Sequence, residues 1–269
     1  MKKLFFFLLV LPLVFMSCGS DNDDPENNIN YLYAIQIDRI DYKFGKPDLT
    51  TKTRISYRIF NKDGYVLSYD SIHVSWAGLI PHKTNFKYNG NNQIIEETRS
   101  GLSKERIEYF YNSDGTLSEE KIYTENGISE IFKYTYKDGV LIRKDEESIV
   151  DYYHLYEYNT QGLLSKEYQY NKSDDKLFYS YIYEYDSKKN LIKKRNISPE
   201  GKEQVVIDYI YEYNNNGKVT QLTSKKLLGD IDVYKYNYNQ ETGLVERMDF
   251  FDGKTNEQTY YCEYKYIYR

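Results

Sequence analysis

Aromatic and polar positions alternate through most of the chain, which is the pattern of a half-buried β-strand. In the stretch YSYIYEY, tyrosine occupies every second position from 179 to 185. The same alternation recurs at 132–136, 209–213, 234–238 and 264–268. Tyrosine favours the pleated surface of a sheet, and a period of two places all these rings on one face. The pattern predicts an all-β protein.

Each aromatic stretch runs into a turn of similar sequence, and these turns recur at spacings of 22 to 28 residues. The leading aromatics are Phe60, Tyr88, Tyr111, Tyr136, Tyr158, Tyr185, Tyr213 and Tyr238. Asn, Asp and Gly in the turns adopt the positive φ angles that tight hairpins need. A second set of turn signals separates the units. The chain is therefore predicted to be an antiparallel up-and-down meander of about 17–18 strands.

The turns differ in length, yet each is expected to keep its leading aromatic opposite an aliphatic residue. The predicted pairs are Tyr111 with Leu117, Tyr136 with Leu141, and Tyr238 with Val245. In the turn YDSKKNLI, Asn190 is expected to take the place that Gly115 has in YNSDGTL. On this register the tyrosine face would also carry basic residues, namely Arg143, Lys166, Lys193 and Arg247.

The region before the regular repeats gives two further expectations. The alternation in YLYAIQIDRIDYKF, at 31–44, predicts an opening strand. The stretch SIHVSWAGLIPHKTNF, at 71–86, contains the sole tryptophan, Trp76, together with a proline and two of the three histidines. It interrupts the repeat and is expected to form a cap or an inserted loop.

A flat meander would leave two unpaired edge strands, and closure into a barrel removes them. We expect a closed or nearly closed soluble β-barrel, with an open, curled single-layer sheet as the alternative. The interior would be lined by tyrosines and be wet or filled with side chains. A transmembrane pore is not expected, because the non-tyrosine face carries charges such as Lys133, Lys137 and Asp208, which cannot face lipid.

The first seventeen residues have the anatomy of a secretory signal. Lys2 and Lys3 precede an apolar run that is too short to span a bilayer. The run ends in VFMSC, which resembles a bacterial lipoprotein cleavage box. The resemblance implies cleavage before Cys18, lipid attachment to its thiol, and a membrane partner through that anchor. An ordinary signal peptide with an incidental cysteine is the alternative.

Residues 18–30 are acidic and rich in Asn, and are expected to form a flexible tether before a single β-domain at 31–269. An acidic run directly after a lipid-bearing cysteine resembles the export signal of Bacteroidetes surface lipoproteins. This implies an outer-membrane anchor with the protein exposed on the cell surface. A plain linker on a lipoprotein that faces the periplasm is the alternative.

The repeated motif Y-x-Y-[ND]-x-x-G-x-[LV], from about 54 to 268, resembles the tyrosine–aspartate (YD, Rhs-type) repeat, here mostly with Asn in the Asp position. Together with the cleavage box, it also resembles a group of Bacteroidetes lipoproteins of unknown function that have a porin-like β-barrel. Rhs proteins build a large shell from such strands. This chain is much shorter and shows no toxin region.

The formal net charge is −5, and removal of Lys2 and Lys3 with the signal would make it −7. A mildly acidic chain argues against nucleic acid as a partner and against electrostatic docking on anionic lipid. If Cys18 is lipidated, Cys262 is left as the one thiol, so an intramolecular disulfide is not expected. Cys262 alternates with Tyr260 and Tyr264 and is predicted to be a small buried residue.

The sequence shows no constellation typical of an enzyme, so no catalytic residue, metal or cofactor is assigned. His73, His82 and His154 have no neighbouring ligands at metal-site spacing, and no glycine-rich loop precedes a helix. Two candidate sites remain. Trp76 is the candidate for ligand contact, and Ser71, in Asp-Ser-Ile, resembles the Bacteroidetes O-glycosylation site. We therefore expect a non-enzymatic lipoprotein that binds a glycan or a partner protein, or alternatively an envelope scaffold.

Overall fold

The computed structural model describes residues 32–75, 78–101, 103–149 and 151–268, which fall within one compact unit, Tyr31–Arg269. These residues form nineteen strands and one short 3-10 helix, η1. Their bounds are β1 Leu32–Lys43, β2 Lys46–Pro47, η1 Leu49–Thr51, β3 Thr53–Phe60, β4 Val66–Ser75, β5 Gly78–Tyr88, β6 Ile94–Ser100, β7 Glu105–Tyr111, β8 Leu117–Thr124, β9 Gly127–Lys137, β10 Val140–Glu147, β11 Tyr152–Tyr158, β12 Leu164–Asn171, β13 Leu177–Tyr185, β14 Leu191–Ile197, β15 Glu203–Tyr213, β16 Val219–Lys226, β17 Ile231–Tyr238, β18 Val245–Asp252 and β19 Glu257–Tyr268. In these ranges no helix is long and apolar enough to cross a membrane.

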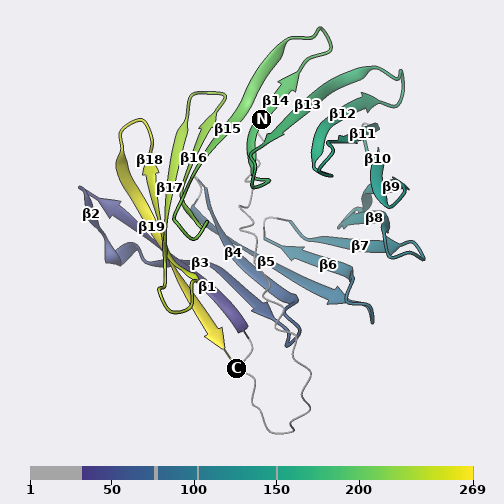
Figure 1. The fold of residues 1–269 in the computed structure, drawn as a ribbon. Coiled ribbons are helices and arrows are strands. Elements are labelled where there is room, and N and C mark those ends of the chain that lie inside the picture. The colour runs from purple at the N-terminus through teal and green to yellow at the C-terminus, as the bar shows by residue number, and fades with distance from the viewer. Residues whose placement is uncertain (1–31, 76–77, 102, 150, 269) are drawn as a thin grey trace. The chain divides into compact units, whose positions relative to one another are not determined.

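The strands close into a barrel in simple chain order (Figure 1). From β3 to β19 each strand pairs antiparallel with the next, and β1 joins the two ends by pairing with both β3 and β19. The short strand β2 pairs with β1. Eighteen strands therefore make a closed antiparallel barrel, as the sequence predicted, and the open-sheet alternative is wrong. The predicted opening strand is confirmed as β1.

The predicted registers around the repeated turns are confirmed. Tyr111 pairs with Leu117, Tyr136 with Leu141, and Tyr238 with Val245. The residue after the leading aromatic explains why Asn or Asp recurs there. In five turns its side-chain oxygen accepts hydrogen bonds from the backbone N–H groups two and four positions later; the acceptors are Asn61, Asn89, Asn159, Asp186 and Asn214. This side chain therefore stabilises the turn by hydrogen bonds to the backbone inside the loop.

The residue that replaces the turn glycine in YDSKKNLI is Lys189, and the prediction of Asn190 is wrong. Lys189 has a φ of 67°, in the left-handed region where Gly115 has 86°. The next residue, Asn190, instead donates its side-chain amide to Asp186 and to the Tyr213 hydroxyl, at 3.1 and 2.6 Å. The two turns have the same length, so their alignment places Lys189 at the glycine position.

Opposite substitutions at these two turns should have opposite effects. A left-handed φ costs a residue with a β-carbon about 1 kcal/mol, whereas glycine adopts it freely. Lys189→Gly should therefore raise the free energy of unfolding, and Gly115→Ala should lower it by about 1 kcal/mol. Urea denaturation of both variants measures this. A loss of stability in Lys189→Gly would show that the lysine side chain matters more than the backbone strain.

Every repeated hairpin contains a β-bulge just after its aliphatic residue, and this changes which side chains share a face. One extra residue stands on the second strand of all eight hairpins. In the β9–β10 hairpin, for example, Leu141 is followed by the unpaired Ile142, and Arg143 then pairs with Thr135. A bulge shifts all later residues to the opposite face. The placement of Arg143, Lys166, Lys193 and Arg247 on the tyrosine face is therefore wrong.

Residues 71–75 and 78–86 are a regular part of the barrel, so the predicted cap or inserted loop is wrong for them. They belong to β4 and β5, which pair without a bulge from Ser68–Asn85 to Ser75–Gly78. Pro81 lies within β5 and pairs with Ile72. The pairing of β5 with β6 begins at Lys83, so Pro81 stands beyond that ladder, where its missing N–H leaves no partner unsatisfied.

The most deeply buried residues gather where the ring is closed. Ile40 and Ala34 of β1 are fully buried, and Cys262 of β19 is 2% exposed. These two strands pair from Leu32–Tyr268 to Asp41–Tyr260. Leu222 of β16 is the other large side chain that is almost fully buried. The junction between the first and last strands is therefore the part of the barrel with the clearest apolar core, and the expected burial of Cys262 is confirmed.

Candidate functional site

The tyrosine face of the sheet lines the inside of the barrel. In β17, Tyr236 is 5% exposed, whereas its neighbours Lys235 and Asn237 are exposed. Burial raises the pKa of the Tyr211 phenol to about 12 and also raises the pKa values of Tyr134 and Tyr234. A closed barrel crowds side chains on its concave side, so the more buried face is the inner one. The expected tyrosine lining is therefore present.

Four leading tyrosines of the motif, and Tyr266 of the last strand, each form a hydrogen bond with the hairpin before. The Tyr111 hydroxyl donates to the backbone carbonyl of Ile94, at 2.7 Å, and Ile94 is the aliphatic residue of the preceding unit. The same contact, at 2.7–3.0 Å, joins Tyr88 to Val66, Tyr185 to Leu164, Tyr238 to Val219 and Tyr266 to Val245. We call these contacts the tyrosine staples. They give these motif tyrosines a structural role.

A second group of inner tyrosines forms a wall of rings along β13 to β19. We call it the tyrosine wall; it comprises Tyr179, Tyr181, Tyr183, Tyr209, Tyr211, Tyr234, Tyr236, Tyr260 and Tyr264. Rings on the same strand contact each other in β13 and β15, with centroids 4.7 Å apart for Tyr179 and Tyr181 and 6.3 Å apart for Tyr209 and Tyr211. Within the described residues, no hydrogen bond engages the hydroxyls of Tyr209, Tyr211, Tyr234, Tyr236 or Tyr264. Those hydroxyls are available to a bound molecule.

From β6 to β14 the lining of the barrel carries a row of charged side chains. After each bulge, the first inner-facing position stands opposite an aromatic ring of the same hairpin. In β6, β8, β10, β12 and β14 this position holds Glu97, Glu120, Lys144, Glu167 and Lys194; we call these five residues the charged row. In β16 and β18 the same position holds Leu222 and Met248, and Ile37 of β1 stands opposite Tyr264. At this position the lining is therefore charged from β6 to β14 and apolar in β16, β18 and β1.

Tyrosines separate the acidic members of the charged row from one another. The Tyr109 hydroxyl donates to Glu97, at 2.8 Å, and Arg99 forms an ion pair with the same carboxylate. Burial raises the pKa of Glu120, which also has a hydrogen bond with Tyr134. Burial disfavours the charged form of a carboxyl group. The acidic end of the row is therefore desolvated and satisfied mainly by phenols.

His154 of β11 is the centre of the most enclosed polar cluster in the lining. Its ring is 5% exposed, and Nδ1 lies 3.1 Å from Glu167 Oε1, while the Tyr183 hydroxyl donates to the other oxygen at 2.7 Å. Burial alone would raise the pKa of Glu167, but the hydrogen bonds from His154 and Tyr183 outweigh it, and the pKa is lowered. Burial lowers the pKa of Lys194, whose ammonium lies 3.7 Å from the Tyr181 ring centroid.

The His154 cluster lacks the ligand set of a metal centre. Glu146 Oε2 lies 3.8 Å from His154 Nε2, on the side away from Glu167. Among the residues that the structure describes, no three His, Cys, Asp or Glu side chains are placed to hold one metal ion. The Cys262 thiol is also unsuited to nucleophilic chemistry, because burial raises its pKa to about 12 and keeps it protonated.

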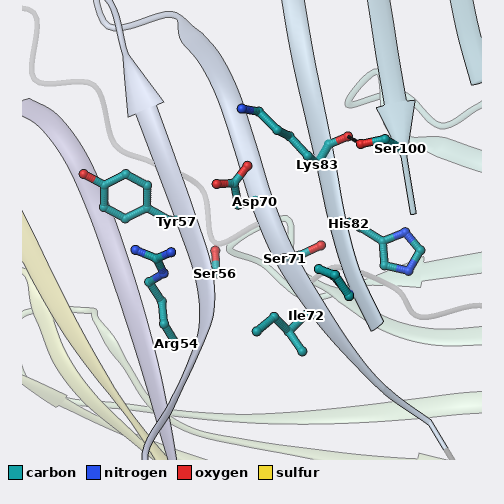
Figure 2. Close-up of a pocket in the computed structure, with 10 residues that line it drawn as sticks. Arg54, Ser56, Tyr57, Asp70, Ser71, Ile72, His82, Lys83 and Ser100 are labelled. Atoms are coloured by element: carbon teal, nitrogen blue, oxygen red, sulfur yellow. Dashed lines mark hydrogen bonds between the residues drawn. The ribbon is translucent and has the colours of Figure 1, made fainter. Parts of the chain in front are cut away.

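Ser71, the candidate O-glycosylation site, lies in a shallow pocket across β3 to β6 (Figure 2). It is half-buried and pairs with Ser56 on one side and His82 on the other. The pocket has a volume of about 320 Å³, and Arg54 and Lys83 also line it. Modification of Ser71 stays a prediction. The lining includes hydroxyl and cationic side chains beside the apolar surface of Ile72 and Pro81.

The other candidate residues lie outside the described residues. These are Cys18, the predicted lipidation site, and Trp76, the candidate ligand contact. The charged row and the tyrosine wall are the features that sequence reasoning missed as sites. The bulges hid the charged row, because they bring Lys144 and Glu167 inward where a simple alternation would bring Arg143 and Lys166.

Comparisons with known proteins show similarity to several solved structures. No family model matches the sequence, and no curated protein matches it. A porin-like protein from Bacteroides uniformis is 12% identical, with a TM-score of 0.44, over 88% of this chain and 98% of that chain. A porin-like protein from Bacteroides vulgatus is 11% identical, with a TM-score of 0.38, over 88% and 99%. The structure of TcdB2-TccC3-Cdc42 is 14% identical, with a TM-score of 0.38, over 78% of this chain, which spans only 12% of that chain.

Proposed function

We propose that this protein is a non-enzymatic lipoprotein of the cell envelope, anchored to the outer membrane through Cys18, whose barrel binds a glycan or a partner protein. The tyrosine wall is the observation that carries this proposal. It presents aromatic rings from β13, β15, β17 and β19 inside the barrel, with five hydroxyls that have no hydrogen-bond partner among the described residues. These tyrosines are additional to those of the tyrosine staples, which hold neighbouring hairpins together.

A glycan fits the tyrosine wall better than other small ligands do. The C–H faces of sugar rings stack on aromatic rings, and phenol hydroxyls both donate and accept hydrogen bonds with sugar hydroxyls. Tyr211, Tyr236 and Tyr264 offer both kinds of group on neighbouring hairpins. Binding sites commonly combine such an aromatic lining with a few polar groups that fix the orientation of the ligand.

The chemistry of the interior supports a binding role over catalysis. The buried Cys262 thiol is protonated at neutral pH. His154 is enclosed between the carboxylates of Glu146 and Glu167, with little solvent contact. A general acid or base must reach the substrate within hydrogen-bond distance. Such an enclosed ring is better suited to holding β10, β11 and β12 together than to proton transfer.

Binding of the fragment 27–269 to glycan panels and to envelope proteins tests the binding role. Each barrel strand pairs within this fragment, so the fragment is expected to fold. Tyr211→Ala should weaken binding about fivefold or more, because one stacked aromatic ring contributes about 1 kcal/mol or more. Tyr123→Ala is the matched control, since Tyr123 belongs to the outer face and bonds Glu108. Binding to none of the panel would favour an envelope scaffold.

The predicted location has a separate test. Protease treatment of intact cells should degrade the chain if the anchor holds it on the outer surface. A chain that resists protease until the outer membrane is broken would place it on the periplasmic side. Labelling with a radioactive fatty acid, with Cys18→Ser as the control, tests the anchor itself. Retention of the label in Cys18→Ser would overturn the assignment of Cys18.

A further inference from the structure

Three hydrogen-bond acceptors without a donor stand on the inner face of β10, β11 and β12. His154 and Gln169 pair directly across β11 and β12, and they are 5% and 6% exposed. His154 Nε2 and Gln169 Oε1 are both buried and have no hydrogen-bond partner among the described residues. Glu146 Oε2 lies 3.8 Å from His154 Nε2, which is beyond hydrogen-bond distance. We call Glu146, His154 and Gln169 the acceptor cluster.

The other ring nitrogen of His154 explains why Nε2 is an acceptor. Nδ1 lies 3.1 Å from the Glu167 carboxylate, which can only accept, so Nδ1 carries the hydrogen of the neutral ring. Lys144 pairs with His154 across β10 and β11 but does not supply the missing donor, because its ammonium lies 4.8 Å from the centroid of the Phe132 ring. Buried acceptors cost free energy when they have no donor. The acceptor cluster therefore lacks a donor that a ligand can bring.

The inner face around the acceptor cluster is more acidic than basic. From β6 to β14 its acidic residues are Glu97, Glu105, Glu120, Glu130, Glu146 and Glu167, and its basic residues are Arg99, Lys144 and Lys194. Arg99 forms ion pairs with Glu97 and Glu105, whereas no Lys or Arg side chain in the described ranges forms one with Glu146. The charge of this part of the interior thus favours a cationic group over an anionic one.

Aromatic rings connect the acceptor cluster to the tyrosine wall. The ring centroids are 5.5 Å apart for Tyr152 and Phe178, 5.4 Å for Phe178 and Tyr179, and 4.7 Å for Tyr179 and Tyr181. Burial raises the pKa of the Tyr179 phenol, and the negative charge of Glu146 contributes to the same shift, so the two side chains are near each other. The faces of aromatic rings attract cations. A ligand on Tyr179 is therefore well placed to direct a positive group at Glu146.

We propose that the glycan bound inside the barrel carries a free amino group, whose ammonium occupies the acceptor cluster. A primary ammonium has three N–H donors for the three acceptors, and its charge complements Glu146. The sugar ring that bears it stacks on Tyr179. The Glu146 side chain is 22% exposed, which leaves a way in from the interior of the barrel. This inference rests on the proposed binding of a glycan and names its chemical class, an amino sugar that is not acetylated.

Calorimetry with two trisaccharides tests the inference on the purified full chain. The probes are the glucosamine trimer, whose amines are free, and the same trimer with every amine acetylated. The free-amine form should bind at least tenfold more tightly, because an acetylated nitrogen has a single N–H and no charge. Both trisaccharides present the same sugar rings to the tyrosine wall, so their comparison isolates the amine.

Three variants locate the amine. Glu146→Gln keeps the shape of the side chain and removes its charge, and should reduce the preference for the free amine at least fivefold. Gln169→Leu should also reduce the preference. Its urea midpoint should equal or exceed that of the parent, because the lost oxygen has no hydrogen bond in the described structure. Glu157→Gln is the matched control on the outer face and should keep the full preference.

Each result separates this inference from the proposed function. Equal binding of the two trisaccharides would overturn the ammonium site and leave glycan binding intact, as would binding of other glycans but of neither trimer. Binding of no glycan at all would overturn both. A preference that survives Glu146→Gln and Gln169→Leu, or that Glu157→Gln reduces equally, would overturn the assignment to the acceptor cluster. A lower urea midpoint in Gln169→Leu would show that this amide stabilises the fold and is not a spare acceptor.

Discussion

A chain that ends before Glu257 is expected to lose the barrel altogether. Strand β19 pairs with β18 on one side and with β1 on the other, so its removal opens the ring and exposes two strand edges. It also removes Tyr261 and Cys262, which are 5% and 2% exposed, and uncovers Ile40. Loss of a central strand exceeds the total stability of a typical domain, about 5–15 kcal/mol. Size-exclusion chromatography should show aggregates, and the thermal unfolding transition should disappear.

A smaller truncation serves as the control for this experiment. Removal of Tyr268 and Arg269 deletes, among the described residues, the pair that Tyr268 makes with Leu32 at the edge of the barrel. That chain should remain monomeric and should unfold in one cooperative transition. If the chain that ends before Glu257 is also monomeric and unfolds cooperatively, closure through β19 is not what stabilises the fold.

Replacement of Glu167 by alanine is expected to destabilise the barrel by about 3 kcal/mol. The change leaves the buried His154 ring and the Tyr183 hydroxyl without their acceptor, and hydrogen bonds to a charged group contribute about 1.5–3 kcal/mol each. Glu157→Ala is the matched control, because Glu157 lies opposite Lys166 on the outer face and is 53% exposed. Its loss should cost less than about 1 kcal/mol. Urea denaturation at pH 7 measures both variants.

The effect of Glu167→Ala should depend on pH in a defined direction. The pKa of Glu167 is lowered in the folded protein, so its carboxylate contributes stability above its unfolded pKa of about 4.3. That contribution is lost as the pH falls through the folded pKa. The difference between the parent and Glu167→Ala should therefore be largest near neutral pH and shrink in acid. A difference that is constant from pH 7 to pH 3 would show that the side chain acts through packing alone.

The sequence repeat predicted the fold in detail, because the signals for strands, for turns and for closure all indicated the same architecture. Alternating tyrosines define the strands, Asn and Gly define the turns, and the unpaired edges of a long meander favour closure. The half-unit that ends the chain, EYKYIYR, needed no turn because it pairs with the first strand. In the turn YDSKKNLI the glycine position was assigned to the wrong residue, because Asn190, next to Lys189, looked like the better glycine substitute.

The bulges were not predictable from residue types. The extra residue is Ser118 in one hairpin, Ile142 in another and Glu246 in a third, so no common side chain marks it. A bulge is a backbone feature that the pairing of two strands decides. The bulges decide which residues face the interior. The charged row could therefore be recognised only in the structure. The stretch 71–86 was misjudged for a different reason. It contains Pro81, and proline usually stands at the end of a strand or on an edge strand.

The tyrosine staples have a consequence for the size of such barrels. Two hairpins carry both the phenol that attaches them to the hairpin before and the carbonyl that receives the strand after; these are the units with Tyr88 and Ile94 and with Tyr238 and Val245. An extra copy of a unit, inserted between two others, would find the same attachments on both sides. The circumference can therefore grow or shrink by duplication or loss of one hairpin, in steps of two strands or about 10 Å. The width of the tyrosine-lined interior is then set by how many copies of the unit a gene contains.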